Sequence, residues 1–430
     1  MLWHIKKIFR FNLMKIKESV KNTLDIFHSK TRTALLWMNL SNEPFVVLYA
    51  LLPFILRKDL GATLLQISIL TALRPVLPLF SFYWSANLTN RKHLLRSNLI
   101  GAWVLGRISF LFIPWIDSVW YIIFCCAVYE FFNKSGIPAL IEILKINIPK
   151  ESREKTYSFY FVLSFIESIL LGFFMGGVLD LHQNSWKFLC CITALIGLTS
   201  LFVQLKLPIP VNNLRLPHPT RNSLKNRIIQ PWKDALSLLK TRPDFARFQY
   251  GFMMGGFGLM LIAPSLSIFY VDKLQLAHSQ LITGRSILMG VGIVLSSYFW
   301  RKALAKLPIS QLTSRILIGF GIFPLTLALS PFHIHWFYLS FIFYGIAQAG
   351  SHLLWNLSGT LFAQDEESSQ FSRVNILMLG LRGILAPALG GILCQFLGPI
   401  PMLFMGALIC FTGAFYMKVA SSNQYLKTHS

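Results

Sequence analysis

Apolar runs of about twenty residues recur along almost the whole chain, separated by short polar segments. A helix needs about 20 mainly apolar residues to cross a membrane, since each residue adds 1.5 Å across a hydrocarbon core of about 30 Å. Of the 430 residues, 54% are hydrophobic and only 13% are charged, which is more apolar surface than a soluble domain can bury. The sequence therefore predicts an all-α polytopic membrane protein.

The apolar runs predict twelve transmembrane helices in two sets of six. The expected spans are 34–56, 62–84, 95–115, 119–141, 156–180 and 186–206, then 245–271, 280–300, 312–330, 335–363, 373–397 and 399–419. The only long interruption is a polar, Pro-rich stretch from Lys206 to Pro243. We therefore predict two pseudo-symmetric bundles, with these parts: an amphipathic tail at 1–33, a bundle at 34–206, a cytoplasmic linker at 207–243, a bundle at 244–419 and a tail at 420–430.

The distribution of Lys and Arg predicts the orientation. With the N-terminus inside, the inner segments carry about 30 basic residues and the outer loops about four. Both termini are therefore expected in the cytoplasm. The formal net charge of +23 does not predict nucleic-acid binding, because the basic residues form short clusters between apolar runs rather than one face.

The N-terminal tail has a helical apolar period. Leu2, Ile5, Phe9 and Leu13 begin a stripe with three- and four-residue spacing, and most of the tail's lysines fall off it. We predict a basic amphipathic helix on the anionic inner leaflet. The alternative is that translation starts at Met14.

The two halves contain a weak internal repeat, of the kind that many transporters share. An offset of 214 residues places Gly136 on Gly350, and Gly176-Gly177 on Gly390-Gly391. These matches fall on corresponding spans of the two sets.

Several stretches resemble the major facilitator superfamily. Ile148–Lys155 is similar to that family's loop between helices four and five, and Gly172–Val178 with Ser185–Lys187 is similar to its fifth helix and the entry to its sixth. Arg382–Gly391 resembles its helix eleven. The resemblance implies a carrier that works by alternating access, with helices one, four, seven and ten lining a central path.

The resemblance also implies a gating loop between helices two and three. The family pattern there is G-x-x-x-D-R-x-G-R-K, and this chain keeps Arg91 but has Asn90 at the acidic position and lacks both glycines. We assign Asn90, Arg91 and Arg153 to the gating loops.

Ionisable residues inside the expected spans need a structural or functional explanation, because inserting each one at mid-bilayer costs roughly 2.5–3.5 kcal/mol of free energy. Three are acidic and five are basic: Glu43, Glu130 and Glu167, and Arg74, Arg107, Lys134, Arg285 and Arg382. The basic excess favours an anionic or zwitterionic solute. We expect Arg107 and Arg285 to have structural or gating roles.

Glu130 and Lys134 are four residues apart and share a helix face in the favourable acid-first order. They can form an internal ion pair that neutralises both groups, or they can line a cavity and contact solute or proton. Glu43 lies on the first helix, which the resemblance also places on the central path. We predict proton coupling through Glu43, Glu130 or Glu167.

A polar line on the tenth span consists of Gln348, His352 and Asn356, each four residues from the next. Three polar groups on one face avoid lipid, so they form either interhelical hydrogen bonds or a cavity wall. Arg74 and Arg382 carry guanidinium groups suited to a carboxylate or phosphate. The predicted solute-binding residues are Glu43, Arg74, Glu130, Lys134, Gln348, His352, Asn356 and Arg382.

We predict a secondary active transporter, a symporter or an antiporter, in the inner membrane of a bacterium. It moves a small organic solute with protons or a counter-solute, functions as a monomer, and uses no cofactor or metal. The alternatives are a multidrug efflux carrier and a non-transporting sensor or scaffold. An enzyme is disfavoured because the histidines are scattered and no acidic cluster joins them, and a channel because two related six-helix halves suit rocking about a central site.

Overall fold

The computed structural model describes residues 2–80, 92–182, 184–209, 224–363 and 368–428, and this part of the chain is helical without strands. The all-α prediction is therefore confirmed. The first half contains α1 (Leu2–Leu60), α2 (Leu64–Val76), η2 (Lys92–Leu94), α4 (Leu95–Ile108), η3 (Ser109–Trp115), α5 (Val119–Asn147), α6 (Lys150–Leu181), α7 (Ser185–Thr199) and α8 (Leu201–Gln204).

The second half begins with a helix in the predicted linker. It contains α9 (Leu224–Thr241), α10 (Pro243–Ile268), η4 (Phe269–Lys273), α11 (His278–Ile282), η5 (Thr283–Leu288), α12 (Met289–Lys306), α13 (Ile309–Ala328), α14 (Ile334–Ala363), α15 (Ser368–Leu397) and α16 (Pro399–Thr428). Of these, η4 and η5 are short π-helical segments.

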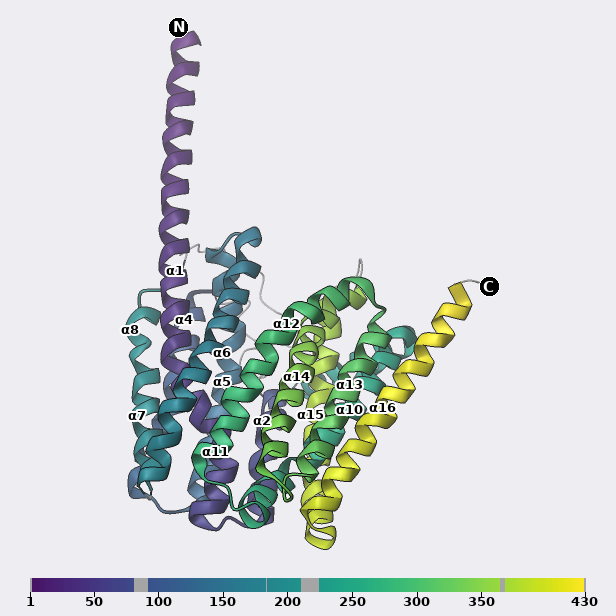
Figure 1. Cartoon of the computed structure of the whole chain (residues 1–430). Coiled ribbons are helices and arrows are strands. Elements are labelled where there is room, and N and C mark those ends of the chain that lie inside the picture. The colour runs from purple at the N-terminus through teal and green to yellow at the C-terminus, as the bar shows by residue number, and fades with distance from the viewer. Residues whose placement is uncertain (1, 81–91, 183, 210–223, 364–367, 429–430) are drawn as a thin grey trace.

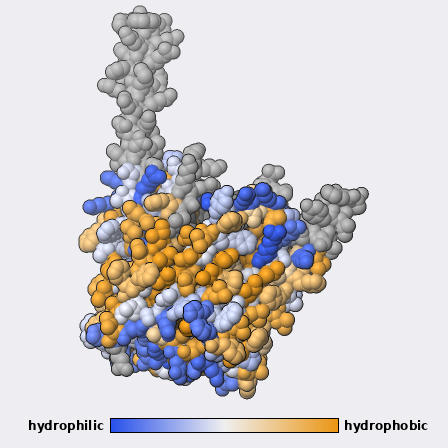
Figure 2. Space-filling view, viewed as in Figure 1, coloured by the Kyte–Doolittle hydropathy of each residue, from blue (hydrophilic) through white to orange (hydrophobic). Residues whose placement is uncertain are grey.

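Nine stretches of the described chain are long and apolar enough to cross a membrane. The three other expected spans correspond to α2, which continues to Phe80, and to α5 and α14, which have 29 and 30 residues. Figure 2 shows a broad hydrophobic band between two hydrophilic ends. Large apolar side chains in the band are exposed, such as Phe173 and Phe174 at 65% and 74%. The chain is thus a multi-pass membrane protein.

Both ends of the helical chain lie on the same side of the bundle, where the N-terminal part of α1 projects beyond it (Figure 1). We call this side the N-terminal face and the other side the opposite face. The 59-residue helix α1 runs without a break through the predicted tail boundary at residue 33. The predicted surface helix is therefore continuous with the first span.

The two halves meet where glycines allow close approach. On α15, a Cβ at Gly391 would lie 2.1 Å from Ser68 Oγ of α2, and a Cβ at Gly383 would lie 2.4 Å from Pro75 Cβ. On α6, a Cβ at Gly176 would lie 3.2 Å from Ser279 Cα of α11. The repeat partner of Gly176 is Gly390, where a Cβ would instead meet Leu261 of its own half, so the contacts between the halves are made by glycines at non-equivalent positions of the repeat.

Candidate functional site

Arg74 of α2 is the centre of a cluster of predicted site residues. It is exposed, although the next residue, Pro75, packs against Gly383 of the other half. Its charge acts on Lys134 of α5 and on His352 of α14. The structure therefore brings together three residues that lie on separate predicted spans.

Arg285 joins this cluster, although we expected it to be structural or a gate residue. It lies in the π-helical segment η5, and π-helical turns occur frequently at functional sites. Its guanidinium interacts electrostatically with Arg74 and with Tyr270 and Tyr344. Two basic groups from different halves therefore lie near each other.

Tyrosines line the cluster on the side of the first half. Tyr49 and Tyr129 have ring centroids 4.8 Å apart, and both interact electrostatically with Arg74 and Glu130. Tyr129 also lies within electrostatic range of Glu43. The charged groups of the spans did not predict these tyrosines. Their positions on the predicted path helices one and four were the available signal.

Glu130 and Lys134 interact, but among the described residues they form no ion pair within 4.0 Å. Glu130 is 3% exposed, and Lys134 is half-buried. The internal ion pair considered from their spacing is not formed in this conformation, and the Lys134 ammonium is left for another partner.

Gln348 and His352, the first two residues of the polar line on α14, lie on one helix face as predicted. Gln348 Nε2 and His352 Nε2 are 3.2 Å apart, so their side chains share one helix face. The side chain of Asn356 lies outside the described residues, as do Asn90, Arg91 and the side chain of Arg153.

Arg382 of α15 comes directly before Gly383, which packs against Pro75 of α2. Its guanidinium covers Gly256 of α10, where a Cβ would lie 1.6 Å from Nη1. Its Nε and Nη1 atoms are buried and have no hydrogen-bond partner. Within the described chain it forms no ion pair with Glu167.

A second acidic site lies between α1 and α6. Ser168 Oγ donates a hydrogen bond to Glu43 Oε1, and the charges of Glu43 and Glu167 act on each other. The Oε2 atom of Glu167 is buried without a hydrogen-bond partner. The structure thus joins two of the three proton-coupling candidates.

Arg107 is fully buried within the first half. Its Cζ atom lies 3.8 Å from the ring centroid of Trp103, Nη1 donates to Trp103 O at 3.1 Å, and Nη2 donates to Asn42 Oδ1. These contacts fit the structural role expected for it.

Polar contacts between the halves occur at the opposite face. Arg57 of α1 donates to both carboxylate oxygens of Asp272 in η4, at 3.2 and 2.6 Å. His278 of α11 lies between Asp59 and Asp180, with N···O distances of 3.3 and 3.2 Å. We call these residues the opposite-face latch. In the sequence, Arg57 is one of the few basic residues of the predicted outer loops.

No group of three or more His, Cys, Asp or Glu side chains within the described part of the chain could hold a metal ion.

Comparison with known families shows that residues 44–387 match the family model described as "Major Facilitator Superfamily". Comparison with curated protein sequences finds no significant match.

Solved transporter structures share the fold at low sequence identity. A POT family transporter in complex with 5-aminolevulinic acid is similar over 91% of this chain and 96% of its own, with a TM-score of 0.74 and 11% identity. A D-xylose-proton symporter has a TM-score of 0.67 and 14% identity, over 91% and 97% of the two chains. A nucleoside transporter has a TM-score of 0.66 and 14% identity, over 90% and 98%.

Proposed function

We propose that this chain, which belongs to the Major Facilitator Superfamily, transports an organic anion or zwitterion by alternating access. It is a secondary transporter of a small solute rather than an enzyme. The site would be the cluster around Arg74, between the two bundles.

The observation that carries this proposal is the charge of the cluster. Arg74 lies within electrostatic range of both Lys134 and Arg285. Among the described residues, Glu130 is the only acidic side chain whose charge acts on both Tyr49 and Tyr129. Within the described chain none of the three bases has an ion-pair partner. A carboxylate or phosphate would provide the missing partner, since guanidinium and ammonium groups bind these oxygens by charge-assisted hydrogen bonds.

The opposite-face latch supports a conformation closed on that side. Arg74 is nevertheless exposed, which supports access to the centre from the N-terminal face. We assign the N-terminal face to the cytoplasm because basic residues dominate the segments there. The protein would then face inward, in the inner membrane of a bacterium, as a monomer with its own path.

Coupling would use the Glu43–Glu167 site. A carboxylate shielded from water binds a proton more readily, and a second carboxylate close by has the same effect. The two groups contact α1 and α6, so their protonation would alter a helix–helix contact. Exchange against a counter-solute is the competing mode of coupling.

The favoured solute class excludes cationic drugs, because the basic cluster would repel them. A multidrug efflux carrier therefore fits the cluster less well than an anion carrier. A non-transporting sensor would bind the same anions without moving them.

The test is a thermal-shift screen of the purified protein with organic anions, amino acids, sugars, nucleosides and cationic drugs. A ligand that binds only the folded state raises the melting temperature. We expect anions to raise it, and Lys134→Gln to weaken binding roughly 10- to 100-fold, since a hydrogen bond to a charged group contributes about 1.5–3 kcal/mol.

Lys233→Gln in α9 is the matched control, because Lys233 is exposed and outside the cluster. It should leave binding unchanged. Stabilisation by organic cations alone would contradict the proposed solute class, and binding without uptake into proteoliposomes would favour a sensor.

A further inference from the structure

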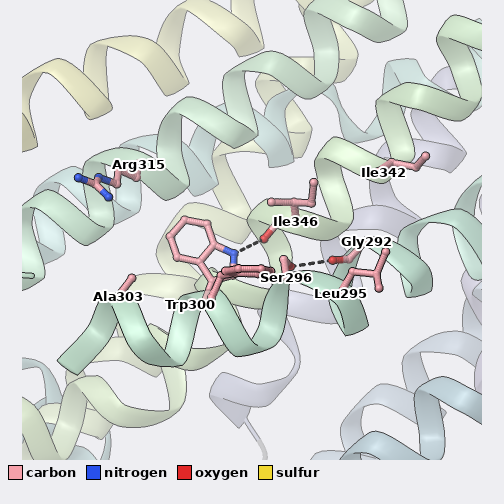
Figure 3. Close-up of a pocket in the computed structure, with 9 residues that line it drawn as sticks. Gly292, Leu295, Ser296, Trp300, Ala303, Arg315, Ile342 and Ile346 are labelled. Atoms are coloured by element: carbon pink, nitrogen blue, oxygen red, sulfur yellow. Dashed lines mark hydrogen bonds between the residues drawn. The ribbon is translucent and has the colours of Figure 1, made fainter. Parts of the chain in front are cut away.

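A groove of about 490 Å³ opens on the surface between α12, α13 and α14 (Figure 3). Its walls include Leu295 and Phe299 of α12 and Ile342 and Ile346 of α14. Leu295 and Phe299 are each 69% exposed, within a helix that spans the membrane. The groove is therefore open to lipid and lies outside the Arg74 cluster.

Small residues form the deep end of the groove. A Cβ at Gly292 of α12 would lie 2.6 Å from the carbonyl oxygen of Ile342, and a Cβ at Gly345 of α14 would lie 2.2 Å from the carbonyl oxygen of Met289. The two helices therefore touch at their backbones here. Nearer the N-terminal face, the ring of Trp300 packs against Gly350 and keeps the helices apart.

The polar side-chain groups inside the groove already have partners. Ser296 Oγ donates to Gly292 O at 2.6 Å, and Trp300 Nε1 donates to Ile346 O at 2.7 Å (Figure 3). Because these groups are satisfied, the interior offers an occupant apolar contact only. A polar solute would lose its hydration there without compensation.

The end of the groove nearer the N-terminal face is basic. Arg315 of α13 is exposed and lines this end, and it has no ion-pair or hydrogen-bond partner within the described residues. Arg301, Lys302 and Lys306 of α12 are also exposed. The segment from His278 to Ile334 contains no Asp or Glu, so no acidic residue of these helices offsets the charge.

Arg315 and Trp300 lie at similar depths. Each is six residues from the end of its helix at the N-terminal face, at Ile309 and Lys306, which corresponds to about 9 Å along the helix axis. Long basic side chains extend to the interface from such positions, and tryptophan is enriched there.

We propose that this groove binds an anionic phospholipid from the leaflet at the N-terminal face, with one acyl chain between α12, α13 and α14 and the phosphate at Arg315. An apolar interior with a basic end matches an amphiphile with one anionic group. A second copy of this chain would instead bury Arg315 without a counter-charge, which is costly.

The bound lipid would contact a helix that also joins the two halves. A Cβ at Gly290, near the start of α12, would lie 3.0 Å from Ile169 of α6. The lipid would therefore stabilise α12 in the position that it has in this conformation.

Native mass spectrometry of the full-length protein tests the site, with dioleoyl phosphatidylglycerol as the probe and dioleoyl phosphatidylcholine as the neutral lipid. We expect one phosphatidylglycerol to remain bound preferentially. Arg315→Gln should weaken its binding about tenfold, the effect of losing roughly 1.4 kcal/mol. Ala303→Leu, which narrows the groove without changing charge, should also weaken it.

Arg247→Gln is the matched control, because Arg247 is exposed near the same face on α10 and outside the groove. It should bind phosphatidylglycerol like the unmodified protein. Equal binding of the two lipids, or equal losses in Arg315→Gln and Arg247→Gln, would overturn the proposal. So would full competition by glycerol phosphate, which lacks an acyl chain, or a dimer that dissociates in Arg315→Gln.

Discussion

Three arginines of the predicted spans have three different surroundings. Arg107 is enclosed by the ring of Trp103 and the amide of Asn42. Arg382 packs against Gly256, and two of its nitrogens have no hydrogen-bond partner within the described chain. Arg74 is exposed. Of these three guanidinium groups, that of Arg74 is the most accessible to a solute.

The contact at Gly256 gives a prediction for one residue. Gly256→Ala should destabilise the protein by roughly 1–3 kcal/mol, because the new methyl group would overlap the Arg382 guanidinium and force it to move. The measurement is the loss of melting temperature in detergent. In an Arg382→Ala background the same substitution should cost less, by a coupling of about 0.5–3 kcal/mol.

Gly101→Ala on α4 is the control, since nothing lies within 4 Å of a Cβ at that position. It should be neutral or stabilise by about 0.5–1 kcal/mol, the usual effect of removing a glycine from a helix interior. Equal losses for the two alanine variants would show that Arg382 does not rest on Gly256.

The contact between α1 and α6 combines polar groups from both helices. Asn39 Nδ2 donates to Tyr160 O at 3.2 Å, and Ser164 Oγ donates to Asn39 Oδ1 at 2.9 Å. One turn further along, Ser168 donates to Glu43, beside Glu167. A proton bound at either carboxylate would therefore change the charge at this helix contact.

We predict that Glu43→Gln separates driven accumulation from exchange. The amide oxygen can still accept the hydrogen bond from Ser168, but the side chain no longer binds a proton. Accumulation of solute driven by a pH gradient into proteoliposomes should be lost, while counterflow of labelled against unlabelled solute persists. Glu142→Gln, at the end of α5, should affect neither. Normal driven accumulation in Glu43→Gln would exclude Glu43 as the coupling group.

At the scale of the whole molecule, the two bundles share one apolar core at the opposite face. Phe54 of α1 and Trp186 of α7 belong to the same buried cluster as Ile262 of α10 and Leu281 of α11. The latch adds directional contacts to this core: Arg57 with Asp272, and His278 with Asp59 and Asp180. Opening the opposite face requires all of these contacts to separate.

The latch predicts that its polar contacts hold this face closed. His278 lies between two carboxylates, Arg57 pairs with Asp272, and Lys58 donates to Leu276 O at 2.7 Å. Arg57→Gln removes the charge that pairs with Asp272, so it should weaken closure of the opposite face by roughly 1–3 kcal/mol, the contribution of charge-assisted contacts.

Spin labels at His182 and Phe332, on exposed turns of the two halves, would report this closure as a distance distribution. The long-distance population should be larger in Arg57→Gln and in His278→Gln than in the unmodified protein. A distribution unchanged in both variants would rule out the latch as what holds this face closed.

Local sequence patterns predict the helices and their lipid environment. Long runs of apolar residues indicate helices in a lipid environment. For spans such as 95–115 and 335–363, the helices of the structure begin and end within a few residues of the predicted bounds. Spacing of four residues correctly placed Gln348 and His352 on one face. These properties depend on residues that are close together in the sequence, so a short segment is enough to predict them.

The packing of the helices determines which charged groups meet. No local sequence pattern predicts that Arg74 lies near Lys134, His352 and Arg285. The same is true of the contact of Arg382 with Gly256 and of the position of His278 between Asp59 and Asp180. Such encounters depend on how helices far apart in sequence rotate and cross, and those rotations are set by packing at glycines such as Gly383 and Gly391. A charge buried in one helix shows that a partner is needed, whereas only the packed bundle selects the partner.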